Sequence, residues 1–117
     1  MCIRDSPHAG AALAVLADRV SVFSSVLGVD PSVDVLRDLG RLHYDLAGFP
    51  VPRQLDALLT LTTFDHLHYG SDYPFTPELG AAAARDRLAG AGNPAGSVPA
   101  ALRANTERLF PRLTERL

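Results

Sequence analysis

The sequence predicts an α/β fold, because two short strand-like segments are each followed by a segment with the periodicity of a helix. A helix of this length can cross back over a sheet, so the two strands are expected to run parallel. Parallel strands need cover on both faces, and two strands with their helices do not supply it. We therefore expect part of a larger α/β sheet.

The first part of the chain is predicted to hold two helices and a strand. Apolar residues recur at three- and four-residue spacing over 11–27, which indicates an amphipathic helix closed by Gly28. Asp30 and Pro31 predict an N-cap and first-turn proline, opening a short helix that stops near Gly40. Residues 42–46 are predicted to form a short strand.

The second part repeats the pattern and adds two helices. The expected elements are a helix that opens at Pro52 and carries Leu55 to Thr62, a strand over 66–69, an Ala-rich helix from Pro77 to about Ala89, a flexible connector over 90–96 and a helix over 98–113.

Composition excludes several classes of function. The chain has 117 residues, 47% of them hydrophobic, and a net charge of −2. All of its basic residues are Arg, which excludes lysine Schiff-base chemistry and a lysine-held phosphate site. There is no basic run for a nucleic-acid surface and no apolar run of 18 residues for a membrane span, so we expect a cytoplasmic protein. One Cys, in the first two residues, permits no internal disulfide.

The first six residues are set aside as foreign to the fold. Met1–Ser6 resembles the translated end of a sequencing adapter that occurs at the ends of reading frames assembled from environmental DNA. A genuine N-terminus is the alternative. On the first interpretation, residues 7–117 are the C-terminal portion of a single domain whose gene was cut upstream.

Polar residues beside the predicted strands are the candidates for chemistry, because the carboxyl ends of parallel strands carry the active site in such folds. His8 stands just before the first helix, and Asp72 follows the second strand. Gly70 and Ser71 are small enough for close approach of a ligand or ion to the backbone.

Four segments together resemble the amidohydrolase-related metal-dependent family, whose members include aminocarboxymuconate-semialdehyde decarboxylase and 6-methylsalicylate decarboxylase. The segments are Pro7–Gly10, Leu42–Ala47, His66–Phe75 and Asn105–Phe110. The resemblance covers residues 7–113 and corresponds to the tail of strand 6, strands 7 and 8 and the C-terminal helices of a (β/α)8 TIM barrel. A whole barrel needs about 250 residues, so the expected barrel is incomplete.

The resemblance implies roles for three residues. Asp72 matches a ligand of one divalent metal ion, zinc or in some members manganese, and the remaining ligands lie upstream of this chain. His8 matches a histidine that acts as acid and base, a role that suits a side chain with an ordinary pKa of about 6.5. Arg19 lies where decarboxylases bind a substrate carboxylate, in some members across a dimer interface, so a homodimer acting on a small carboxylate is implied.

Each assignment has a simpler alternative. Asp72 can cap a loop, His8 can be a surface histidine, and Arg19 can be solvated on a helix face. Asp45 can contact substrate, but a strand-end carboxylate that accepts backbone N–H groups is the favoured interpretation. Ala11 stands where family members often have a second glycine, which puts close approach of a ligand there in doubt.

Two other patterns are rejected as sites. His66 and His68 have the spacing of the family's first metal pair, but His68 lies about 13 Å down the strand from Asp72 at 3.3 Å per residue. A Ser-His-Asp hydrolase is excluded because the chain has no Gly-x-Ser-x-Gly elbow.

The sequence thus predicts a fragment of a metal-dependent enzyme, most simply a non-oxidative decarboxylase of a small aromatic or unsaturated acid. A hydrolase of an ester, lactone or amide is the alternative, because the same residues serve both reactions. The chain alone is expected to be inactive and prone to aggregate through exposed strand edges.

Overall fold

The computed structural model describes residues 8–92 and 97–116. The adapter-like residues and part of the predicted connector, residues 93–96, lie outside the described residues. The helices are α1 (Leu13–Val26), α2 (Val35–Gly40), α3 (Arg53–Leu58), α4 (Glu78–Ala89) and α5 (Val98–Leu109); the strands are β1 (Tyr44–Asp45) and β2 (Leu67–His68); and the 3-10 turns are η1 (His8–Gly10), η2 (Phe64–His66) and η3 (Pro111–Arg116).

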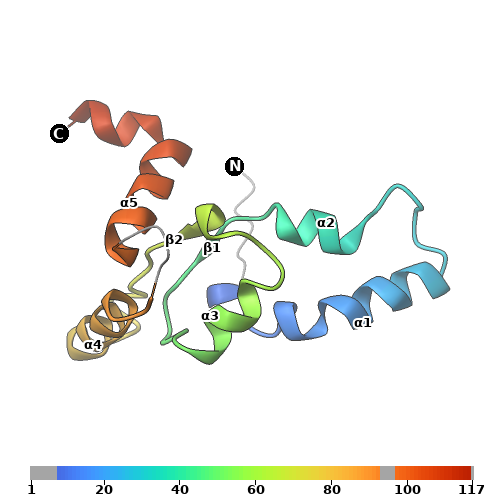
Figure 1. Cartoon of the computed structure of the whole chain (residues 1–117), viewed down its shortest axis with the longest axis horizontal. Helices are drawn as coiled ribbons and strands as arrows, with labels where there is room; N and C mark the ends of the chain where they lie inside the picture. Colours follow the sequence, from blue (N-terminus) through green and yellow to red (C-terminus); the bar gives the residue numbers. More distant parts are fainter. Residues whose placement is uncertain (1–7, 93–96, 117) are drawn as a thin grey trace.

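The two strands pair in parallel, as the sequence predicts. Tyr44 lies opposite Leu67 and Asp45 opposite His68, and the Leu46 N–H donates to the His68 carbonyl at 2.9 Å. Figure 1 shows the pair between α4 and α5 on one side and α1, α2 and α3 on the other. Each strand is shorter than predicted, because a parallel ladder extends only where both chains keep extended dihedrals and a partner.

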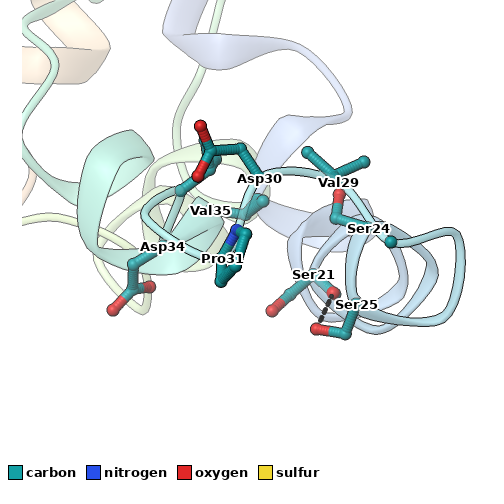
Figure 2. Close-up of a pocket in the computed structure, with 10 residues that line it drawn as sticks. Ser21, Ser24, Ser25, Val29, Asp30, Pro31, Asp34 and Val35 are labelled. Carbon is teal, nitrogen blue, oxygen red and sulfur yellow. Dashed lines mark hydrogen bonds between the residues drawn. The ribbon is translucent and has the colours of Figure 1, made fainter.

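Helix α2 begins later than the sequence predicts. The Asp30 carboxylate accepts from the Ser32 N–H at 2.9 Å, which makes Asp30 and Pro31 part of a turn. The N-cap is Asp34, which is extended and accepts from the Arg37 N–H at 3.0 Å. Figure 2 shows both aspartates and Pro31 in the segment that joins α1 to α2. The assignment of Asp30 as the cap is therefore wrong.

Two other helices end earlier than predicted. Helix α3 stops at Leu58 instead of running to Thr62, whose hydroxyl donates to the Gly40 carbonyl at 2.7 Å. Helix α5 stops at Leu109, because Phe110 precedes Pro111 and has left the helical region. The remaining residues of the predicted 98–113 helix enter the 3-10 turn η3.

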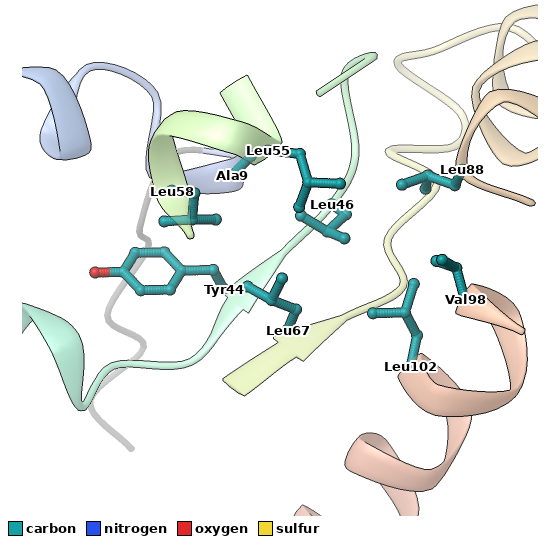
Figure 3. Close-up of a cluster of buried hydrophobic side chains, with 9 residues drawn as sticks. All are labelled: Ala9, Tyr44, Leu46, Leu55, Leu58, Leu67, Leu88, Val98 and Leu102. Carbon is teal, nitrogen blue, oxygen red and sulfur yellow. The ribbon is translucent and has the colours of Figure 1, made fainter. Parts of the chain in front are cut away.

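The core lies between the strand pair and the helices that follow each strand. Figure 3 shows side chains of both strands meeting those of α3, α4 and α5. The buried residues of this cluster are Ala9, Tyr44, Leu46, Leu55, Leu58, Leu67, Leu88, Val98 and Leu102. The buried Asn105 amide donates to the carbonyls of Phe64 and Leu67 at 2.7 and 2.9 Å, which joins α5 to β2.

Much apolar surface remains outside this core. On α1, Val15, Val22 and Val26 are 75%, 61% and 74% exposed. The radius of gyration is 15.7 Å, whereas a compact domain of this length has about 13 Å. The elements thus surround a strand pair without closing over it, in keeping with the incomplete barrel that the sequence predicts. Within the described ranges, no helix has both the length and the apolar character to cross a membrane.

Replacement of Leu67 by Ala should lower the free energy of unfolding by about 2–5 kcal/mol, because Leu67 is fully buried between both helix layers. Urea unfolding of the dilute chain, followed by circular dichroism, measures this. Leu79→Ala is the matched control, since Leu79 is 87% exposed. Equal effects of the two substitutions would contradict the position of the core.

Candidate active site

The structure brings His8 between two carboxylates. Its Nδ1 lies 2.8 Å from Asp45 Oδ1, and its Nε2 lies 3.1 Å from Asp72 Oδ1. The three residues come from η1, the end of β1 and the loop after β2. Two sequence candidates, His8 and Asp72, are therefore in contact, and Asp45 joins them through the other ring nitrogen.

The two carboxylates raise the pKa of His8 above 6.5. The hydrogen bond from Asp45 is the largest cause, burial opposes it, and the charges of Asp45 and Asp72 add to it. An imidazolium can donate to both carboxylates at once, whereas a neutral ring donates to only one. The site therefore favours a protonated His8 that can return a proton through Nε2.

Asp45 is positioned by its backbone neighbours. Its Oδ1 accepts from the Ala47 N–H at 3.0 Å, which agrees with the favoured interpretation of a strand-end carboxylate that satisfies backbone donors. A Cβ at Gly70 would lie 2.9 Å from the same oxygen, so any other residue there would displace the Asp45 carboxylate. Sequence reasoning missed the contact of Asp45 with His8. The available signal was the parallel pairing, which places the end of β1 beside the Gly70–Asp72 segment.

Asp72 is held in a left-handed backbone conformation, with φ of 57°. Asp adopts this region more readily than most residues. Thr76 donates to Asp72 twice, from its N–H to the backbone carbonyl at 2.7 Å and from its hydroxyl to Oδ2 at 2.9 Å. The second carboxylate oxygen, Oδ1, is thereby left facing His8.

The backbone after His8 is left-handed over three consecutive residues. The φ angles of Ala9, Gly10 and Ala11 are 48°, 70° and 43°. A non-glycine residue in this region costs about 1–2 kcal/mol. The turn is held by Gln54 of α3, whose amide donates to the His8 carbonyl at 2.9 Å. Ala11, which the sequence marks as a departure from the family, thus occupies a position that suits glycine.

One oxygen donor of a metal site is present, but a full set is not. Asp72 offers a carboxylate, a ligand that zinc and manganese both accept, and its side chain is 26% exposed. Among residues 8–92 and 97–116, no group of three His, Cys, Asp or Glu side chains is arranged to hold an ion. The described residues therefore offer one carboxylate that suits such an ion and no complete set of ligands.

The remaining candidate, Arg19, is not brought to this site by any contact. It is exposed on α1, and it forms no ion pair with another residue in the part of the chain that the structure describes. A surface pocket of about 510 Å³ lies at the turn between α1 and α2 (Figure 2), and one of about 260 Å³ lies between α4 and α5. His8, Asp45 and Asp72 line neither pocket.

Comparison with known proteins places this geometry in context. No protein-family model matches the chain, and no curated protein matches it. One crystal structure is 35% identical in sequence, with a TM-score of 0.77 over 88% of this chain. It is the structure of an amidohydrolase II. This chain spans 33% of the length of that amidohydrolase.

The similarity supports the amidohydrolase resemblance at the level of family and fold. Sequence identity of 35% over most of the chain goes together with the same fold, and a strand pair flanked by helices is compatible with part of a TIM barrel. The shared fold and the 35% identity do not distinguish a decarboxylase from a hydrolase. The name of that protein also specifies neither a metal ion nor a substrate.

We expect His8 to titrate above pH 6.5 in the metal-free chain and Asp45→Asn to bring its pKa down, because the Asp45 hydrogen bond is the largest cause of the shift. Ring-proton NMR measures this, with Asp38→Asn as a control at an exposed carboxylate that pairs with Arg37. A raised pKa in the folded state means that His8 adds stability below pH 6.5 and loses it as the pH rises through the raised value. An unchanged His8 pKa in Asp45→Asn would contradict the contact.

Proposed function

We propose that this chain is the C-terminal part of an amidohydrolase-type (β/α)8 enzyme, and that the complete enzyme removes carbon dioxide from a small aromatic or unsaturated carboxylic acid without oxidation. The observation that carries the proposal is the contact of His8 with Asp72 at the carboxyl ends of parallel strands. The similarity to an amidohydrolase supports the fold and the family in which this contact is interpreted.

His8 is the proton-handling group in this proposal. Asp45 holds Nδ1 of the ring, so Nε2 is the atom that exchanges a proton with substrate. Delivery of that proton to the carbon that bears the carboxylate allows the carbon–carbon bond to break. The electrons of the broken bond restore the double bond of the ring or alkene, and carbon dioxide leaves.

Asp72 has two functions in the same proposal. It faces Nε2 of His8, which keeps the ring oriented and favours its protonated form. Its carboxylate would also hold a divalent metal ion, zinc or manganese, together with ligands outside this chain. Such an ion supplies a Lewis acid that polarises an oxygen of the substrate and lowers the pKa of bound water toward about 7.

Arg19 is proposed as a binding residue for the substrate carboxylate. Its guanidinium is exposed on α1, the helix that follows the His8 turn, and a guanidinium fork matches a carboxylate with two parallel hydrogen bonds. The exposed apolar residues of the same helix, such as Phe23, which is 56% exposed, are compatible with the homodimer that we propose.

Hydrolysis of an ester, lactone or amide is the second candidate. It is favoured by the name of the similar protein, an amidohydrolase II, and the same two residues serve it. In that reaction His8 would transfer a proton to the leaving group instead of to carbon.

Assays of the complete enzyme on a panel of substrates distinguish decarboxylation from hydrolysis. We expect release of carbon dioxide from one or more hydroxybenzoates and no turnover of aryl esters or lactones above background. Gas release and ultraviolet absorbance measure the two activities side by side. Turnover confined to esters or lactones would overturn the decarboxylase and favour the hydrolase.

Substitutions of Asp72 and His8 should have different effects on the bound metal and on the turnover. In the complete enzyme, Asp72→Asn should lower both bound metal and turnover, whereas His8→Gln should lower turnover about 10²–10⁴-fold and keep the metal. Elemental analysis and initial rates measure these changes. Asp86→Asn is the control, because Asp86 is an exposed residue on α4 that pairs with Arg85. If Asp72→Asn kept its full metal content and full activity, the assignment of Asp72 to the site would be wrong.

A further inference from the structure

The other three histidines form a second cluster on the same strand pair. His43 and His66 stack, with ring centroids 4.6 Å apart and planes at 10°. His43 Nδ1 lies 2.8 Å from His68 Nε2. They come from the residue before β1, the end of η2 and β2 itself. We refer to His43, His66 and His68 as the histidine cluster.

The hydrogen bonds of the cluster require a neutral His68 ring. The Thr106 hydroxyl donates to the Leu102 carbonyl at 3.1 Å and therefore accepts from His68 Nδ1, which lies 3.0 Å away. His68 Nε2 is then an unprotonated acceptor for the N–H of His43. A proton added at the other nitrogen of His43 leaves both bonds intact, whereas a proton on His68 Nε2 makes two N–H groups face each other.

The charges around the cluster add to this preference. Partial loss of solvation is the largest cause of the lowered pKa of both His43 and His68, and Arg108 of α5 lowers the pKa of both rings further. The neighbouring histidines lower the pKa of both rings further. Asp65 of η2 opposes this effect at His43.

The carboxylate on the β1 side does not compensate for these effects. Asp45 lies opposite His68 in the strand register, but its Oδ1 is bound to His8 and to the Ala47 N–H. Among the described groups that act on the cluster, Asp65 is thus the one acid that favours a charged ring.

A metal ion does not explain the cluster. Zinc lies about 2.0–2.1 Å from each imidazole nitrogen that binds it, whereas the two facing nitrogens here share a direct hydrogen bond. No His-rich group able to hold a metal is found in the described parts of the chain.

The cluster joins the beginning of both strands to the last turns of α5. Thr106 is adjacent to Asn105, whose amide donates to carbonyls of η2 and β2. Arg108 donates to the Asp65 carbonyl at 2.9 Å. A change in charge on His68 therefore acts where α5 is attached to the strand pair.

We propose that the histidine cluster is an acid-sensitive clasp, which holds the C-terminal half of α5 on β2 while His68 is neutral and loosens this contact when His68 is protonated. A pKa that is depressed in the folded state contributes stability above the unfolded value of 6.5 and loses it as the pH falls through the folded value. The loosening is thus expected below pH 6.5. It concerns the α5 contact and requires neither metal nor turnover, so it stands independently of the proposed function.

Hydrogen exchange of the 117-residue chain tests the clasp. Peptides from 98–109 should exchange about fivefold to tenfold faster at pH 5.5 than at pH 7.5, after correction for intrinsic rates and relative to peptides from α3, because the opening of this segment no longer breaks the His43–His68 and His68–Thr106 hydrogen bonds. His68→Leu should abolish this acceleration. His43→Gln should reduce it, and because His43 is exposed this variant tests the clasp even if His68→Leu fails to fold.

The control is His8→Gln, which removes the one histidine outside the cluster and should leave the α5 response intact. Hydrogen exchange is measured by mass spectrometry after quenching, in the same way for the wild type and the three variants. The clasp is overturned if wild-type α5 shows no acceleration at pH 5.5, or if His43→Gln and a folded His68→Leu accelerate as the wild type does.

Discussion

The short parallel pairing of β1 with β2 is the constraint on which both histidine systems depend. Its register places Asp45 opposite His68, and the chain beyond β2 then passes Gly70 beside the Asp45 carboxylate. A slip of one residue would turn every side chain of a strand to the opposite face. Tyr44 and Leu67 would leave the core, and Asp45 would leave His8. Burial of those two apolar side chains therefore also sets the position of the polar ones.

The two histidine systems respond to protonation in opposite directions. His8 lies between two carboxylates, which favour its charged form, whereas His43 and His68 lie near Arg108 and near each other, which favours neutral rings. The difference arises from neighbours and not from burial alone, since burial lowers the pKa of all three rings. Acid thus strengthens the His8 contacts and weakens those of the cluster, although both are built on the same pair of strands.

Local patterns in the sequence predicted the order of elements and the two residues that meet at the candidate site. Apolar spacing located α1 closely, because a helix face repeats within a few residues, and the Pro77 start with an Ala-rich run located α4. The start of α2 was wrong, since Asp30 and Asp34 are equally good caps by residue type and only the local hydrogen bonds decide between them. The role of Asp45 was missed for a different reason: its contact with His8 joins residues 37 positions apart and follows from strand register.

The left-handed turn after His8 shows why such a site is built from small residues and held from several sides. Gly10 lies against the Tyr44 ring, where an added Cβ would come within 3.2 Å of a ring carbon. Ala9 and Ala11 keep positive φ angles that alanine disfavours. The opposing contributions are burial of Ala9 and the hydrogen bond from Gln54 to the His8 carbonyl. Because core packing holds this strained turn, the imidazole is oriented before any ligand arrives, and a ligand at Asp72 meets a ring already in place.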